Sequence, residues 1–150
     1  MDQPNPFKDQ SNPYAAPSGP SARRSSVHSM TPMEILTSFE GRIPRSTFWL
    51  YSLATGFIGA LVVAVLVFGA MAVLGESPLV FIPAIVVYIP LVFVSLAIQC
   101  KRWHDRDKSG WWWLIGLIPY IGGIWALVEC GCLAGTPGPN RYGADPLGRR

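Results

Sequence analysis

The sequence predicts an all-α membrane protein with about three transmembrane helices, a short interfacial helix and a disordered N-terminal tail. Of its 150 residues 50% are hydrophobic and only 14% are charged, whereas soluble domains carry about 25% charged residues. The charges are nearly absent from three long apolar blocks. A soluble core large enough to hide all three blocks would need a longer chain. We therefore expect the blocks to lie in lipid.

The first thirty residues form the predicted tail, 1–30. Five prolines occur there among Asn, Gln and Ser, with almost no aliphatic periodicity. Such a composition cannot bury enough apolar surface to fold. The stretch also lacks the apolar core of a secretory signal.

Order is predicted from residue 31, and the membrane domain is expected to span 31–146. Thr31 as N-cap, Pro32 at the first helical position and Glu34 at the third form a capping box. We expect this helix to lie on the membrane surface and to stop at Gly41. Its apolar residues are Met33, Ile35, Leu36 and Phe39.

The first predicted span covers 48–74, a block without any charged residue. It is long enough to cross a bilayer with tilt. Arg42 and Arg45 precede it, and Ser46 is the expected N-cap. Four small residues recur every fourth position and predict a face for close helix packing: Ser52, Gly56, Ala60 and Ala64.

The second predicted span covers 79–100. A tight turn at Gly75–Pro78 precedes it, with Ser77 and Pro78 starting the helix. Pro83 and Pro90 remove backbone donors, so we expect them to bend this span.

The third apolar block, 111–133, has the length of one kinked span. A break at Pro119–Gly123 would instead give a shallow hairpin that returns the chain to the same face. In an unbroken helix Glu129 lies about 27 Å from Trp111, near the far interface. A carboxylate at that depth is a hypothetical functional site.

A charged run, Gln99–Trp113, separates the second and third blocks and ends in three tryptophans. Basic residues and tryptophans are typical of the membrane–water boundary. We therefore interpret the run as a cytoplasmic loop whose residues contact anionic headgroups or a partner. With the basic residues before the first span, the candidates are Arg42, Arg45, Lys101, Arg102, His104, Asp105, Arg106 and Lys108.

The distribution of lysine and arginine predicts a cytoplasmic N-terminus. Five of the 12 positive charges precede the first span and four lie in the charged run, whereas the turn between the first two spans has none. With three spans, the last three arginines, including those of the basic end 147–150, would lie outside. That placement is the one count against three spans.

Three motifs, in order, resemble those of a known family. Phe39–Ile43 with Arg45 and Phe48–Trp49 resembles an F-x-G-R-x-x-R-x-x-F/Y-W motif, and Arg102–Asp105 with Ser109–Trp112 resembles R-R-L-H-D-x-x-x-S-G-W-W. The C-terminal stretch resembles G-T-P-G-x-N-R-[FY]-G-x-D-P through Gly135, Pro137, Asn140, Arg141, Gly143 and Asp145.

These motifs are similar to those of the YhaH-like family of small bacterial inner-membrane proteins, domain-of-unknown-function family 805. The departures are small: Lys101, Trp103 and Ala144 stand where Arg, Leu and Pro are usual. The resemblance implies a multi-pass protein of the bacterial inner membrane. It implies no established activity.

The favoured function is a non-enzymatic helical module that contacts membrane lipids and assembles with itself or another membrane protein. The Arg102, His104 and Asp105 side chains then form a local structural network. Four basic residues between spans are a poor nucleic-acid surface. The three cysteines have neither disulfide nor zinc-site spacing, so we expect no metal and no cofactor.

Two alternatives remain at this stage. A small transporter or channel component would use Glu129 and the kinked spans. A membrane-face enzyme would use His104 as a base with Asp105 nearby and Arg102 on a phosphate. Adjacent His and Asp side chains project in different directions, so we expect no enzyme.

The sequence leaves open whether the C-terminal motif shares a compartment with the charged run. In that case, Arg141 and Asp145 would pair with Asp105 and Arg102 in a single polar site.

Overall fold

The computed structural model describes residues 30–149. The predicted tail, apart from Met30, and Arg150 at the basic end lie outside the described residues. Within the described range the chain is helical and contains no strand, only an isolated bridge between Asn140 and Gly143. The all-α fold class is therefore confirmed.

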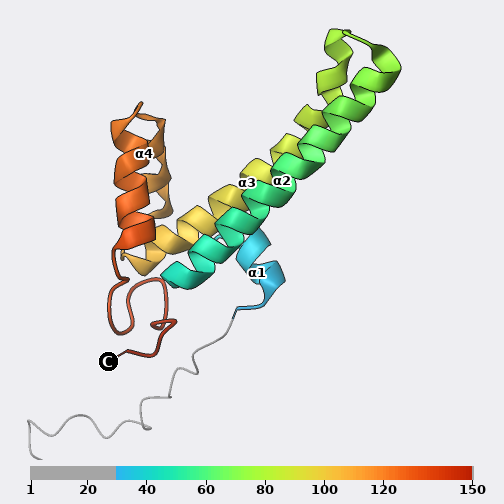
Figure 1. Ribbon diagram of the computed structural model, residues 1–150. Coiled ribbons are helices and arrows are strands. Elements are labelled where there is room, and N and C mark those ends of the chain that lie inside the picture. The colour runs from blue at the N-terminus through green and yellow to red at the C-terminus, as the bar shows by residue number, and fades with distance from the viewer. Residues whose placement is uncertain (1–29, 150) are drawn as a thin grey trace, which may run out of the picture.

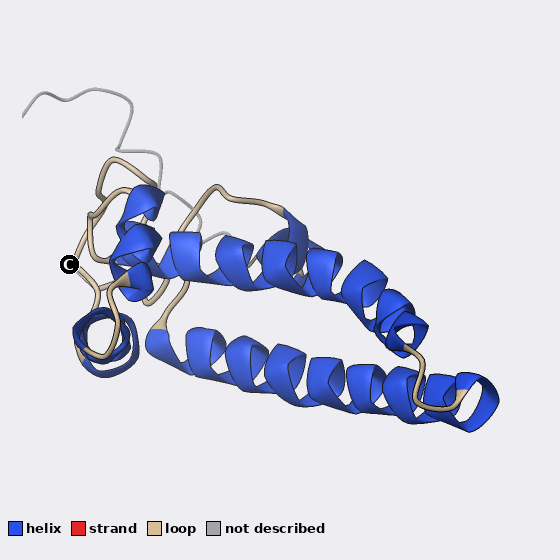
Figure 2. Ribbon diagram, turned by 90° about the horizontal axis from the view of Figure 1, so that it is seen from above, coloured by secondary structure: helices blue, strands red, loops and turns tan. Residues whose placement is uncertain are grey.

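Two long antiparallel helices dominate the molecule: α2, Arg45–Leu74, and α3, Ile82–Asp105. They run side by side over most of their length (Figures 1 and 2). Arg45–Leu74 and Pro78–Asp105 are both long and apolar enough to cross a membrane, and only 6% of the most apolar window of each is buried. A core helix of a soluble protein would be mostly buried, so the exposure agrees with a lipid environment.

The turn between α2 and α3 forms as predicted. Gly75 ends α2 with a φ of 64°, a conformation that suits glycine. Ser77 then accepts a hydrogen bond from the backbone N–H of Leu79, and Pro78 starts the short helix η1, Pro78–Phe81. Of the two prolines expected to bend the span, Pro83 lies in the first turn of α3, where no helical donor is needed, and Pro90 lies inside the helix.

The N-terminal helix α1, Pro32–Thr37, has the predicted capping box at Thr31. Its predicted end is wrong: the helix stops at Ser38, in an extended conformation, before Phe39 and Gly41. Gly41 instead occupies a later turn with a φ of 87°. Ser46 is not the N-cap of α2 either, because the helix already begins at Arg45 and Pro44 occupies the cap position.

The third apolar block is not one helix but a hairpin. Gly110–Leu117 forms a 3₁₀ helix, η2, and the chain reverses before α4, Ile121–Ala126, which continues as a π-helical turn, η3, over Leu127–Cys132. Figure 1 shows the hairpin beside the long pair, with η3 ending where α3 ends. The single kinked span over 111–133 is corrected to the hairpin alternative.

Two residues explain the reversal. Tyr120 has a φ of 64°, outside the helical region. Gly122 lies so close to η2 that a Cβ there would be 1.7 Å from the carbonyl oxygen of Ile115. Pro119, which has no N–H, precedes both. The two halves of the hairpin therefore meet backbone to backbone at a glycine.

The predicted small-residue stripe lies only partly between α2 and α3. Gly59, one position from it, makes the close approach, because a Cβ there would be 2.9 Å from Leu91 Cδ1. Gly56 and Ala60 are exposed and line a groove of about 420 Å³ between the two helices. The stripe remains a prediction of contact with a further helix.

The core is small and lies at one end of the long pair, where α1, η3 and the C-terminal segment converge (Figure 1). It is built from the buried residues Ile35, Ile43, Phe48, Ile98, Trp103 and Cys130. The charged run and the family motifs are adjacent to this core, so the same end carries the candidate site.

Candidate functional site

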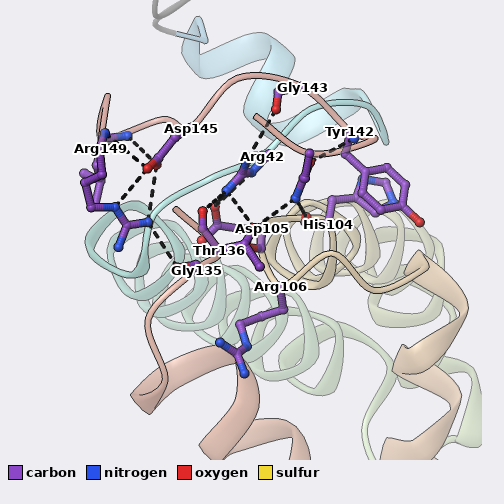
Figure 3. Close-up of polar contacts among 12 residues, drawn as sticks. Arg42, His104, Asp105, Arg106, Gly135, Thr136, Tyr142, Gly143, Asp145 and Arg149 are labelled. Atoms are coloured by element: carbon purple, nitrogen blue, oxygen red, sulfur yellow. Dashed lines mark hydrogen bonds and ion pairs between the residues drawn. The ribbon is translucent and has the colours of Figure 1, made fainter. Parts of the chain in front are cut away.

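Asp105, the last residue of α3, is the centre of a buried polar cluster (Figure 3). Its Oδ1 accepts hydrogen bonds from Arg42 Nε at 3.1 Å and Arg42 Nη2 at 3.0 Å, and its Oδ2 accepts from Arg102 Nη1. The three side chains are at most 2% exposed. One carboxylate therefore holds two guanidinium groups from different parts of the chain.

Backbone carbonyls take the remaining donors of the two arginines. Arg42 donates to Thr136, Gly138 and Gly143. Arg102 donates to Cys130 and Leu133. Because every acceptor after Asp105 comes from the hairpin end or the C-terminal segment, the arginines fix those segments to α3.

The C-terminal segment also binds the main chain of Asp105. The carbonyl oxygen of Asp105 accepts hydrogen bonds from Thr136 N at 2.8 Å and from Thr136 Oγ1 at 3.2 Å. Gly135 lies so close that a Cβ would be 1.9 Å from Asp105 Oδ2. The Gly–Thr pair of the third motif is thus required by contact with Asp105.

Lys101 is completely buried, and its side chain binds the carbonyl oxygens at the end of α1. Its Nζ donates to the carbonyl oxygen of Ile35 at 3.0 Å and also to that of Ser38. A cation near the last carbonyls of a helix satisfies acceptors that have no helical partner. Lys101 therefore anchors α1 to α3.

Glu129 is part of the same end of the molecule. It accepts from Arg106 Nε at 3.0 Å and from Lys108 Nζ at 2.5 Å. The Lys108 ammonium also lies 5.0 to 5.8 Å from the ring centroids of three tryptophans, Trp103, Trp112 and Trp125. The expected position at the far interface is wrong because the hairpin returns the chain to the end of α3, where the carboxylate that the transport hypothesis invoked is paired with two cations.

His104 does not contact Asp105 through its side chain. Its Nδ1 lies 3.2 Å from the Gly41 carbonyl oxygen, and its ring stacks on Tyr142 with centroids 3.8 Å apart (Figure 3). Asn140 Nδ2 donates to the His104 carbonyl oxygen at 2.9 Å. A base oriented by the adjacent carboxylate, as the enzyme hypothesis required, is therefore not formed.

The C-terminal motif joins the charged run, but through different pairs from those expected. Arg141 pairs with the exposed Asp107 and Asp145 pairs with Arg149 at 2.9 Å. Burial would raise the pKa of Asp145, yet the hydrogen bonds from Arg149 and from the Leu147 N–H, with the nearby positive charges, hold that pKa below its usual value. Arg42 takes the place on Asp105 that was expected for Arg141, and Arg102 pairs with Asp105 instead of Asp145.

The structure revises the predicted surface site. Arg42, Lys101, Arg102 and Asp105 are buried and bonded to protein, so they do not reach headgroups. His104, Arg106 and Lys108 are half-buried, and Arg45, which donates to the Cys132 carbonyl oxygen, is the exposed member. Within residues 30–149, no group of three or more His, Cys, Asp or Glu side chains is arranged to hold a metal ion.

Two contributors to the polar cluster were not predicted from the sequence. Thr136 lies inside the third motif of the resemblance, but it carries no charge that would mark it as a site residue. The three-tryptophan cage around Lys108 had no signal in the sequence, because Trp103 and Trp125 are 22 residues apart and meet only through the hairpin.

Residues 36–144 match the family described as "Protein of unknown function (DUF805)". The chain belongs to this family. Arg42, Asp105 and Thr136, which join the three motifs in the cluster, all lie inside the matched region. The resemblance noted in the sequence is therefore confirmed.

Two of the relatives are named as inner membrane proteins of Escherichia coli. Inner membrane protein YhaH of Escherichia coli K12 is 40% identical over 110 residues, covering 72% of this chain and 86% of the relative. Inner membrane protein YhaI of the same strain is 36% identical over 72% of this chain and 85% of the relative. The uncharacterized protein YiiR is 29% identical over 77% and 90%. No solved structure matches the chain.

Proposed function

We propose that this DUF805 protein is a non-enzymatic module of the inner membrane with two membrane-crossing helices and a hairpin that enters and leaves on one side. The spans are α2 and Pro78–Asp105. The longer arm of the hairpin, Ile121–Cys132, has 12 residues, about 18 Å of helix, against about 30 Å of hydrocarbon.

The charge distribution supports an N-inside, C-inside orientation for this arrangement. All 12 lysines and arginines then lie on the side of the N-terminus, and the turn Gly75–Ser77 opposite carries none. The positive-inside rule makes that side cytoplasmic. The three C-terminal arginines, which counted against three spans, agree with two.

The observation that carries the non-enzymatic role is the internal use of the motif charges. Asp105 is saturated by Arg42 and Arg102, Glu129 by Arg106 and Lys108, and Asp145 by Arg149. Such a network positions chain segments, and it occupies the Asp105, Glu129 and Asp145 carboxylates with partners inside the protein. We infer that its role is to hold α1, the end of the hairpin and the C-terminal segment together at the cytoplasmic end of α3.

The partner that we propose is a second copy of the chain, seated along α2. The groove beside Gly56 and Ala60 presents small residues at the surface of α2, and its α3 side adds Ser95 and Gln99. Small residues let helix backbones approach closely, and polar side chains add hydrogen bonds between helices in lipid. The exposed Arg45 is the residue that we expect to contact anionic headgroups.

Disulfide crosslinking in native membranes tests this assembly. In a background without Cys100, Cys130 and Cys132, Ala60→Cys is expected to give a disulfide-linked dimer on oxidation. Ile58→Cys, which is 58% exposed on another face of α2, is the matched control and is expected to remain monomeric. A monomer at Ala60→Cys, or equal dimer yields at both positions, would contradict the proposed interface.

A further inference from the structure

A pocket of about 330 Å³ lies beside the polar cluster, between the segment after α1, the end of α3 and the start of η2. Its volume is at the lower end of the range for small-molecule sites. Three aromatic side chains line it, Phe39, Trp111 and Trp113. Polar atoms come from Cys100, His104 and Ser109.

Gly110 lies close to two of these polar atoms, Cys100 Sγ and His104 Nε2. A Cβ on Gly110 would lie 2.6 Å from Cys100 Sγ and 3.5 Å from His104 Nε2. Both atoms therefore face the point where η2 begins. Because glycine has no side chain, the imidazole edge stays open toward the pocket instead of being covered.

The contacts of His104 determine which role its Nε2 atom takes. A carbonyl oxygen only accepts, so the contact with Gly41 places the hydrogen on Nδ1. At pH 8 an imidazole of ordinary pKa, about 6.5, is neutral, and Nε2 then carries a lone pair. Stacking on Tyr142, with 5° between the ring planes, fixes the direction of that lone pair.

Ser109 complements this acceptor. Its Oγ accepts from the backbone N–H of Trp111 at 3.5 Å, which leaves the hydroxyl hydrogen able to donate. Trp111, the second residue of η2, is 73% exposed. The pocket thus combines aromatic walls with an acceptor on His104, a donor on Ser109 and the Cys100 thiol.

We propose that this pocket binds the ring of a membrane-dissolved quinol, with a ring hydroxyl donating to His104 Nε2. A planar ring matches the aromatic walls, and its second hydroxyl oxygen can accept from Ser109. The oxidised quinone has only carbonyl acceptors, and an oxygen lone pair toward Nε2 is repulsive. The pocket therefore discriminates in favour of the reduced, hydroxyl-bearing ring.

Calorimetric titration of the full-length protein in detergent tests this preference. The probes are duroquinol, duroquinone and the dimethyl ether of duroquinol, at pH 8 without oxygen and with detergent alone as the blank. Four ring methyl groups prevent addition of the cysteine thiols. We expect the quinol to bind about tenfold more tightly than the quinone or the ether, the effect of one hydrogen bond to a partly buried acceptor.

Two variants separate the pocket from general partition into the micelle. His104→Phe keeps an aromatic ring but removes Nε2, and we expect it to bind all three probes equally. Tyr142 stacks on the same imidazole but does not line the pocket. We therefore expect the Tyr142→Phe variant to keep the tenfold preference. Trp111→Ala is a further variant at an exposed position and should weaken binding of every probe. Equal affinities in the wild-type protein, or a quinol preference that persists in His104→Phe, would overturn the proposal.

Discussion

Replacing Asp105 with asparagine is expected to destabilise the protein by about 3–5 kcal/mol, because the Arg42 and Arg102 guanidinium groups would lose their common counter-charge inside the protein. Their other partners are carbonyl oxygens and the Thr136 hydroxyl, which do not neutralise a charge. We expect a lower melting temperature in detergent and a low steady-state level in the membrane.

Asp107→Asn is the matched control for this prediction. Asp107 lies two residues on and also pairs with an arginine, but it is 48% exposed and its partner Arg141 is 61% exposed. Exposed pairs contribute at most about 1 kcal/mol, so the melting temperature should hardly change. Similar melting temperatures for the two variants would mean that Asp105 does not hold the cluster together.

The second large effect is expected at Gly122. An alanine Cβ there would lie 1.7 Å from the Ile115 carbonyl oxygen, and backbone cannot move aside as a side chain can. Overpacking of this kind costs about 1–3 kcal/mol and occasionally more. We expect Gly122→Ala to open the hairpin and to pull η3 away from the core.

The buried thiol of Cys130 reports that opening. In a background without Cys100 and Cys132, Gly122→Ala should make Cys130 react with a maleimide much faster than in the parent protein. Gly123→Ala is the neighbouring control, since a Cβ at Gly123 meets nothing within 4 Å, and it should label like the parent. Equal labelling of the two variants would contradict the hairpin contact.

The long elements could be predicted because their causes are local. Uncharged stretches of sufficient length predicted the two long helices, and the side chains of Thr31 and Ser77 marked helix starts through hydrogen bonds to the next few residues. The ends of α1 and α2 were less predictable. Gly41 is a residue type that often ends a helix and Ser46 is one that often caps a helix. In the structure, however, α1 ends at Ser38 and the N-cap of α2 is Pro44.

The site could not be derived because its contacts are distant in sequence. Arg42 and Asp105 are 63 residues apart, and nothing local distinguishes a buried arginine from one that touches a headgroup. Lys101 illustrates the same limit. At the end of an apolar helix it resembles a surface cation, yet the carbonyls of α1 supply its acceptors inside the protein. Only the family resemblance indicated that the three motifs belong together.

The side of the membrane on which the C-terminus lies tests the central claim most directly, because the cluster requires all three motifs in one compartment. Reporters active only in the cytoplasm or only in the periplasm would be fused after Arg150, with fusions after Glu76 as the control for the opposite side. We expect a cytoplasmic C-terminus and a periplasmic Glu76. A periplasmic C-terminus would mean that the third block crosses the membrane, and it would contradict the cluster around Asp105.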